Sequence, residues 1–201
     1  MRHTGPLACE GVAWQGVELR TPPGLAQTVG MTVWTVGHSN VAVEVLLETL
    51  GAAGVEVVCD IRRFPMSRRN PQFNREAMAA SLAGAGIEYQ HWVNLGGRRP
   101  PDEDSMNLGL RDAGFRGFAD YMWTPEFDAA LAALMELATS RRVAVMCAEA
   151  LPWRCHRSLL SDALVARGVE VRHLVGGKER LHTLSPHARM QDGRVAYPAL
   201  L

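Results

Sequence analysis

The sequence has almost no lysine and no net charge. Its 21 basic residues balance 21 acidic ones, and Lys178 is the only lysine, so the other basic residues are arginines. A chain without net charge has no overall field that attracts nucleic acid or a membrane surface. Arginine, however, binds phosphate and carboxylate groups through two parallel hydrogen bonds. The positions of the arginines therefore matter more than their number.

The patterns that mark export, membrane insertion or a disulfide framework are also missing. No apolar run approaches the roughly 18 residues that a membrane span needs. The first 30 residues lack the charged and apolar regions of a signal peptide. The four cysteines contain no C-x-x-C pair, which is typical of reduced thiols rather than structural disulfides. We therefore expect a cytoplasmic protein that does not enter a membrane.

The domain organisation follows from where hydrophobic periodicity begins and ends. We expect residues 1–30 to form an irregular N-terminal extension, or Met31 to be the true initiator, because a strand-like pattern begins only after Met31. Residues 31–175 are expected to form one domain, and residues 176–201 a tail packed on it. At 201 residues the chain is long enough for one well-buried domain and short for two.

From Met31 on, apolar strand-like runs alternate with helical patterns. The strand-like runs are TVWTV, VEVVCDI, IEYQHW, RRVAVMC and VEVRHL. Thr124 and Pro125 form the clearest helix start, since they combine an N-cap residue with proline at the first helical position. The alternation predicts right-handed β-α-β crossovers and a mostly parallel sheet. The predicted fold class is therefore α/β: a single Rossmann-like domain of three layers, with a mostly parallel five-stranded sheet flanked by helices.

Polar residues follow each of these strands. In open parallel sheets, ligands bind beyond the carboxyl ends of the strands, so these residues are expected to meet at one rim. The candidate site residues selected in this way are His38, Ser39, Asp60, Arg62, Arg63, Arg68, Asn94, Cys147, Glu149, Arg154, Cys155, His156 and Arg157.

The order of the motifs resembles a known family. The segments TVGHSN, VVCDIRRFPMSRRNPQFN, YQHWVNLGG, FADYM and VAVMCAEALPWRCHRSLLSDALVARGVEVRHL lie in this order between Thr32 and Leu174. Together they resemble a bacterial family catalogued as domain of unknown function 488, and the block from Cys147 to Arg157 is the most specific part. The resemblance implies an α/β domain with two functionally important cysteines. It implies no reaction, and the cofactor is unknown.

The two cysteines of this block are candidate nucleophiles. We expect Cys155 in the first turn of a helix, where the helix N-terminus and the neighbouring Arg154 and Arg157 stabilise a thiolate. Cys147, at the end of a strand, is the alternative nucleophile. Two thiols this close are also candidates for a reversible disulfide.

Other residues of the rim are candidates for proton transfer and substrate binding. His38 and His156 suit acid–base work near neutral pH, and Glu149 is either a general base or a partner of Arg157. The residues expected to bind the substrate are Ser39, Asp60, Arg62, Arg63, Arg68, Asn94, Arg154 and Arg157. With aromatic residues such as Phe64 between them, they suit a phosphate- or nucleotide-bearing molecule.

Three functions of different classes remain open. The leading hypothesis is a thiol-dependent enzyme with an anionic substrate, and it assigns no metal ligand. The second is a nucleic-acid-binding module whose arginines hold a segment of the backbone while the cysteines are structural. The third is a metal-binding domain that uses Cys147, Cys155, His156 and a further histidine, His38 or His173, because these ligand types suit zinc. The oligomeric state is left open.

Overall fold

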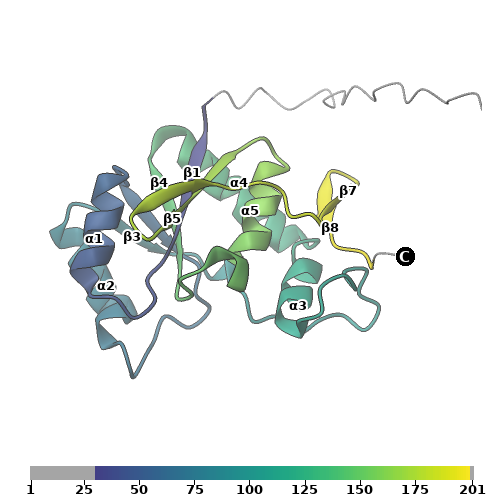
Figure 1. Ribbon diagram of the computed structural model, residues 1–201, viewed down its shortest axis with the longest axis horizontal. Coiled ribbons are helices and arrows are strands. Elements are labelled where there is room, and N and C mark those ends of the chain that lie inside the picture. Colours follow the sequence, from purple (N-terminus) through teal and green to yellow (C-terminus); the bar gives the residue numbers. More distant parts are fainter. Residues whose placement is uncertain (1–29, 200–201) are drawn as a thin grey trace, which may run out of the picture.

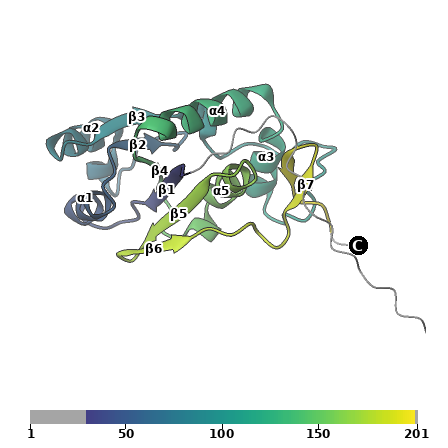
Figure 2. The same ribbon diagram turned by 90° about the horizontal axis from the view of Figure 1, so that it is seen from above.

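A six-stranded sheet forms the centre of the molecule. The structure, a computed structural model, describes residues 30–199, so the predicted extension and its Cys9 lie outside the described residues, apart from Gly30. Figure 1 gives an overview of the molecule, and Figure 2 shows the strand order, which is β3-β2-β4-β1-β5-β6. The parallel strands are β1 (Thr32–Gly37), β2 (Val57–Asp60), β3 (Glu88–His91), β4 (Val143–Cys147) and β5 (Glu170–Val175), and β6 (Lys178–Leu181) is antiparallel.

Helices cover both faces of this sheet, which confirms the predicted three-layer α/β fold. The helices are α1 (Val43–Ala52), α2 (Arg75–Gly84), α3 (Ala113–Tyr121), α4 (Pro125–Ser140) and α5 (Arg157–Val165). Val58 of β2 packs in the core with α1 and α2, whereas its neighbours Val57 and Cys59 pack with α3, α4 and α5. Successive strand residues thus point to opposite faces, as the pleat of a strand requires.

Local sequence signals explain several element ends. The predicted start of α4 is confirmed, because the Thr124 hydroxyl accepts a hydrogen bond from the backbone N–H of Phe127 at 3.3 Å. The sequence did not predict α3, which begins where the Asp112 carboxylate accepts from the N–H of Phe115.

The chain after Leu174 contributes a sixth strand, where five were predicted. Gly176 and Gly177 have φ angles of 59° and 71°, which suit a tight hairpin turn, and β6 then pairs with β5 (Figure 2). A small hairpin of β7 (Arg189–Gln191) and β8 (Arg194–Ala196) follows, and Tyr197 beyond it is buried.

The strand order places a crevice at the carboxyl ends of the central strands. β4 lies between β1 and β2. The helices that follow β1 and β2 pack on one face of the sheet, whereas α5, which follows β4, packs on the other. Where the chain leaves neighbouring parallel strands toward opposite faces, a ligand crevice opens beyond their ends. His38, Asp60 and Cys147 are brought to this place.

Candidate active site

A pocket of about 290 Å³ lies at this crevice. Its lining residues are His38, Ser39, Arg62, Arg63, Phe64, Met66, Ser67, Asn70, Gly97, Arg98, Cys147, Ala148 and His156. They come from the segments that follow β1, β2, β3 and β4. Three of these lining residues are arginines and two are histidines, and none carries a carboxylate. The residues that line the pocket therefore carry formal positive charge and no formal negative charge.

Cys147 and Cys155 lie together at the base of the pocket. Their sulfur atoms and one ring nitrogen of His156 all lie within 4.8 Å of one another, and the Cys155 Sγ lies 3.6 Å from Nδ1 of His156. Cys147 lines the pocket, whereas Cys155 is buried behind it with 5% of its surface exposed. A ligand in the pocket therefore meets Cys147 first.

The position of Cys155 differs from the prediction that placed it in the first turn of a helix. Pro152 begins a short 3-10 helix, Pro152–Arg154, which ends at Cys155 in an extended conformation. α5 begins only at Arg157. The charges next to Cys155 therefore come from side chains rather than from its own place in a helical turn.

The two thiols are joined by a hydrogen bond, which shifts their pKa values in opposite directions. A hydrogen bond from Cys147, with further help from His156 and Arg157, holds the pKa of Cys155 well below its usual range in spite of burial. The same hydrogen bond and burial raise the pKa of Cys147. Of the two cysteines, Cys155 is therefore the one that loses its proton more easily.

Arg157 lies behind this pair as a fully buried cation. Its Nη2 donates to the backbone carbonyl oxygens of Glu149 and Ala150, and its Nη1 donates to the Thr35 hydroxyl. Its Nε has no hydrogen-bond partner within the described residues, and no carboxylate there forms an ion pair with it. A buried charge is costly unless it is compensated. The charge of Arg157 in turn lowers the pKa of both Cys147 and Cys155.

Gly37 explains how Arg157 reaches this place. A Cβ atom on Gly37 would lie 1.8 Å from the carbonyl oxygen of Glu149 and 2.8 Å from Nη2 of Arg157. A side chain at the end of β1 would therefore push away the loop that follows β4. Glu149 contributes this carbonyl oxygen, whereas its side chain is exposed and does not line the pocket.

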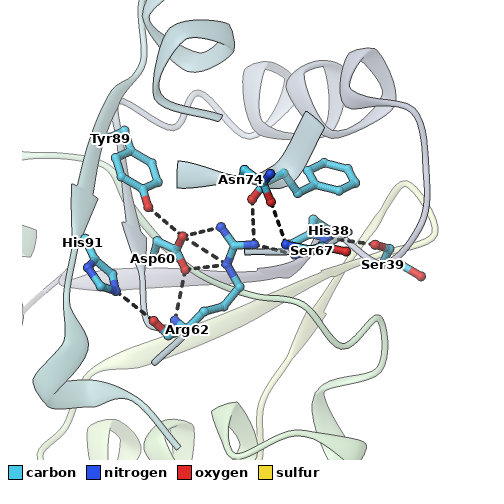
Figure 3. Close-up of polar contacts among 9 residues, drawn as sticks. His38, Ser39, Asp60, Arg62, Ser67, Asn74, Tyr89 and His91 are labelled. Atoms are coloured by element: carbon cyan, nitrogen blue, oxygen red, sulfur yellow. Dashed lines mark hydrogen bonds and ion pairs between the residues drawn. The ribbon is translucent and has the colours of Figure 1, made fainter. Parts of the chain in front are cut away.

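A second buried arginine, Arg62, is fully engaged with the protein (Figure 3). Its Nε and Nη2 donate to the carboxylate of Asp60 at 2.9 Å and 2.5 Å. Its Nη1 donates to the carbonyl oxygen of Phe73 at 2.8 Å and to Nε2 of His38 at 3.1 Å. Most of the five N–H donors of this guanidinium are thus satisfied inside the molecule.

His38 is held as a neutral ring. Its Nδ1 lies 2.8 Å from the carbonyl oxygen of Ser39, which only accepts, so the proton is on Nδ1 and Nε2 accepts from Arg62. Burial and the charge of Arg62 lower the pKa of His38 to about 4. The ring also stacks on Phe73 with centroids 4.1 Å apart. His38 therefore orients Arg62, and neither of its nitrogens is free for a substrate.

The pocket mouth carries less restrained cations. Arg63 donates from Nη1 to the carbonyl oxygen of Arg98, and within residues 30–199 no carboxylate pairs with either side chain. Arg98 is exposed and has a φ of 58°. Phe64 and Met66 stand beside them with 63% and 81% of their surface exposed. The mouth thus offers two cations and an apolar platform.

Five predicted binding residues lie outside the pocket lining, and two of them, Asp60 and Arg157, are buried. Arg68 and Arg154 are exposed, and Asn94 lines a different depression beside α4. The strand order placed their loops correctly, but the direction in which each loop leaves the sheet turns these side chains away.

Other residues of the site were not singled out from the sequence. The Tyr89 hydroxyl donates to Asp60 at 2.8 Å, and Nε2 of His91 donates to the carbonyl oxygen of Arg62 at 2.8 Å (Figure 3). Both residues belong to β3, the strand that pairs with β2. Their place opposite Val58 and Asp60 in a parallel ladder was the available signal.

Three side chains of the site have the chemistry of metal ligands, namely Cys147, Cys155 and His156. Two features of the donor set fit a metal poorly. A ligating histidine normally donates its second N–H to a partner, whereas Nε2 of His156 is buried with no hydrogen-bond partner within the described residues. The buried Arg157 also places a positive charge where a dication would bind.

The fold and the site define a three-layer α/β protein with a cysteine pair at the carboxyl end of its sheet. The chain belongs to the family described as Domain of unknown function DUF488, whose model matches residues 42–164, more than half of the sequence. No curated protein and no solved structure matches the chain. None of the helices among the described residues is long and apolar enough to cross a membrane.

Proposed function

We propose that the protein is a thiol-dependent enzyme that acts on an anionic substrate carrying a phosphate group. The observation that carries this proposal is the buried Arg157, which has no carboxylate partner within the described residues and lowers the pKa of two thiols whose sulfur atoms lie within 4.8 Å of each other. A low-pKa thiolate in a cationic pocket is the usual arrangement of a cysteine nucleophile.

In this proposal, the sulfur of Cys147 is the atom that attacks the substrate. As the sulfur of Cys147 forms a bond to an electrophilic centre of the substrate, the bond between that centre and its leaving group breaks, and the leaving group takes the electron pair. The proton of Cys147 passes to the sulfur of Cys155, which accepts the hydrogen bond between them. Negative charge thus leaves Cys155 as the new bond forms at Cys147. Arg157 and His156 stabilise the thiolate before the reaction, and His38 holds Arg62 in place at the wall.

The proposed substrate class follows from the pocket mouth. Arg63 and Arg98 would hold a phosphate group, and the exposed Phe64 offers a face on which a base or another flat group stacks. A nucleotide combines both features. We further propose a cytoplasmic location, since the cysteine pair works only as reduced thiols and the three cysteines of the described residues are free.

The test is the rate of alkylation of each cysteine against pH, followed by peptide mass spectrometry. We expect the Cys147–Cys155 pair to react as a thiolate with a pKa well below about 8.5. Cys59 is the internal control, because burial raises its pKa to about 12 and it lies in the core. Inorganic phosphate should slow the reaction of the pair and leave the rate at Cys59 unchanged.

Different results would favour the other two classes of function. If both cysteines stay inert in the folded protein, the thiolate mechanism is wrong. Stoichiometric zinc in protein purified without added metal would then support a metal-binding domain. Salt-dependent binding of oligonucleotides by a variant that lacks both cysteines would support a nucleic-acid module.

A further inference from the structure

A line of hydrogen bonds runs from Arg157 away from the pocket to a buried carboxylate. Nη1 of Arg157 donates to Oγ1 of Thr35 at 3.4 Å, and this hydroxyl lies 2.7 Å from Nδ1 of His173. Nε2 of His173 lies 2.9 Å from Nδ1 of His182, whose Nε2 lies 2.9 Å from Oδ1 of Asp162. Thr35, His173, His182 and Asp162, here called the buried polar chain, are all at least nine-tenths buried.

One choice of histidine tautomers lets every hydrogen bond of the buried polar chain run from Arg157 toward Asp162. Arg157 can only donate, so Thr35 accepts from it, and with this choice the Thr35 hydroxyl donates to Nδ1 of His173. His173 then carries its proton on Nε2 and donates to His182, which donates in turn to the carboxylate of Asp162. Thr35, His173 and His182 each use one donor and one acceptor, and the carboxylate of Asp162 only accepts.

This arrangement requires both histidines to be neutral and Asp162 to be charged. Burial, His182 and Arg157 lower the pKa of His173 to about 4, so its ring is neutral at pH 7. Burial opposes the charge on Asp162, but hydrogen bonds from His182, Ser185 and Tyr197 together lower the pKa of this carboxyl. The chain therefore ends in a stable anion that several donors hold in place.

Arg157 is held from two sides as a result. The loop after β4 supplies carbonyl acceptors to Nη2, and Thr35 is the acceptor for Nη1 among the described residues. Thr35 lies on β1, between the strand that carries Cys147 and the strand that carries His173. Without its hydroxyl, one side of the guanidinium would lose its support.

We propose that Thr35, His173 and His182 are positioning residues of the thiol site, which act through Arg157. Anchored by Asp162, they hold the guanidinium in the orientation that stabilises the thiolate of the cysteine pair. The inference rests on the proposed function and extends it to residues far from the pocket lining. His182 and Tyr197 belong to the segment after β5, so this segment completes the site although the family match ends at residue 164.

Other titratable and charged groups lie around the guanidinium of Arg157 and the two thiols. They are His38 after β1, Asp60 and Arg62 after β2, His156 before α5, and Asp162 on α5. None of these is altered in the variants below, so a change in the thiolate pKa reports on Arg157.

The test replaces Thr35 with valine and repeats the alkylation profile of the cysteine pair. Thr35→Val keeps a β-branched residue in the strand and removes only the hydroxyl link. We expect the thiolate pKa to rise by about one unit, which shifts the alkylation profile to higher pH and makes alkylation about tenfold slower at any pH below both pKa values. Thr35→Ser restores the hydroxyl and should restore the wild-type profile. Thr32→Val makes the same change at the other end of β1 and should have no effect.

A second variant tests the far end of the buried polar chain. His182→Leu breaks the link to Asp162 and should shift the profile in the same direction, whereas His187→Leu changes an exposed histidine of the same segment and should not. Circular dichroism establishes that each variant is folded. Should Thr35→Val fail to fold, His182→Leu decides by the same criterion.

The two ideas fail in different ways. If wild-type protein shows a thiolate of low pKa while folded Thr35→Val and His182→Leu leave it unchanged, the positioning role is wrong and the proposed function stands. If the wild-type pair shows no such thiolate, the proposed function itself is wrong.

Discussion

Two buried arginines lie on either side of the cysteine pocket, and their surroundings are opposite. Arg62 forms an ion pair with Asp60, and most of its remaining donors meet a carbonyl oxygen and His38. Arg157 is more deeply buried, has no carboxylate partner among the described residues, and leaves its Nε unsatisfied. The charge of Arg62 is thus neutralised by a carboxylate, whereas within the described residues the charge of Arg157 is not.

This difference indicates that the two arginines have different roles. A paired guanidinium adds little field to its surroundings and serves to hold a loop, here the segment that leads from β2 to α2. An unpaired buried cation is maintained at a cost to stability, and such costs gather at functional sites. Arg62 is therefore part of the pocket wall. In the proposed function, the charge of Arg157 stabilises the thiolate of the cysteine pair.

The largest expected effect on stability comes from Arg62→Met. This change leaves the fully buried Asp60 without its ion-pair partner and with the Tyr89 hydroxyl as its remaining side-chain donor among the described residues. Breaking a buried ion pair in this way costs about 3–5 kcal/mol of unfolding free energy. Urea unfolding at pH 7 measures it. The double variant Asp60→Asn/Arg62→Met removes both charges and should regain part of the loss. A loss within the range of about 0–1 kcal/mol that exposed ion pairs contribute would contradict the structural role.

Arg157→Met should separate function from stability. Because no buried carboxylate loses its ion-pair partner, we expect a smaller loss of stability than for Arg62→Met. The cysteine pair should lose a buried cation that lowers its pKa, so the thiolate pKa should rise by about one unit, or about 1.4 kcal/mol. The alkylation rates of Cys147 and Cys155 against pH measure this shift. Equal losses of stability in the two variants would remove the contrast between the arginines.

The pH dependence of stability should reflect two neutral histidines: His38, which binds Arg62, and His173 of the buried polar chain. Their folded pKa of about 4 lies below the unfolded value near 6.5 for His38 and His173, so the unfolded chain binds protons first as the pH falls. Stability should fall between pH 6.5 and 4 by roughly 1 kcal/mol per pH unit for each histidine. Urea unfolding of His173→Asn should show a shallower slope than wild type. His187→Asn, at an exposed site, should keep the wild-type slope.

The smallest effect is expected at the pocket mouth. Arg98→Ala removes an exposed cation, so we expect inorganic phosphate to protect the cysteine pair about two- to fivefold less well, with no change in stability. Protection is measured as the phosphate concentration that halves the alkylation rate. Arg154→Ala, exposed and outside the pocket lining, is the control. Equal effects in both variants would show that phosphate responds to overall charge and not to this mouth.

The sequence was sufficient for the fold and for the location of the site. Alternating strands and helices predict a parallel sheet, and a parallel sheet brings His38, Arg62 and Cys147 to one edge, as the structure shows. What the sequence could not supply is the direction of each side chain within the loops. Asn94 and Arg154 follow strands just as Cys147 does, yet they point elsewhere.

Pairing of charges was also beyond a reading of single residues. Arg62 and Arg157 are the same residue type in the sequence. In the structure, the carboxylate of Asp60 pairs with Arg62, whereas no carboxylate among the described residues pairs with Arg157. The buried polar chain is formed by residues from β1, α5, β5 and the segment after β6, so no local pattern marks it. Contacts of this kind depend on the register of the assembled sheet.

The place of β4 in the sheet has a consequence for how the molecule folds. Val143 pairs with both Val33 and Val57, so the centre of the sheet is completed by a strand made late in synthesis. Contacts between such distant positions form slowly, because a long loop must close before they are gained. Until β4 inserts, Cys147 has neither its neighbours nor Arg157 beside it. In the proposed function, the reactive thiolate therefore requires the insertion of β4. The alkylation rate of the cysteine pair during refolding would report this step.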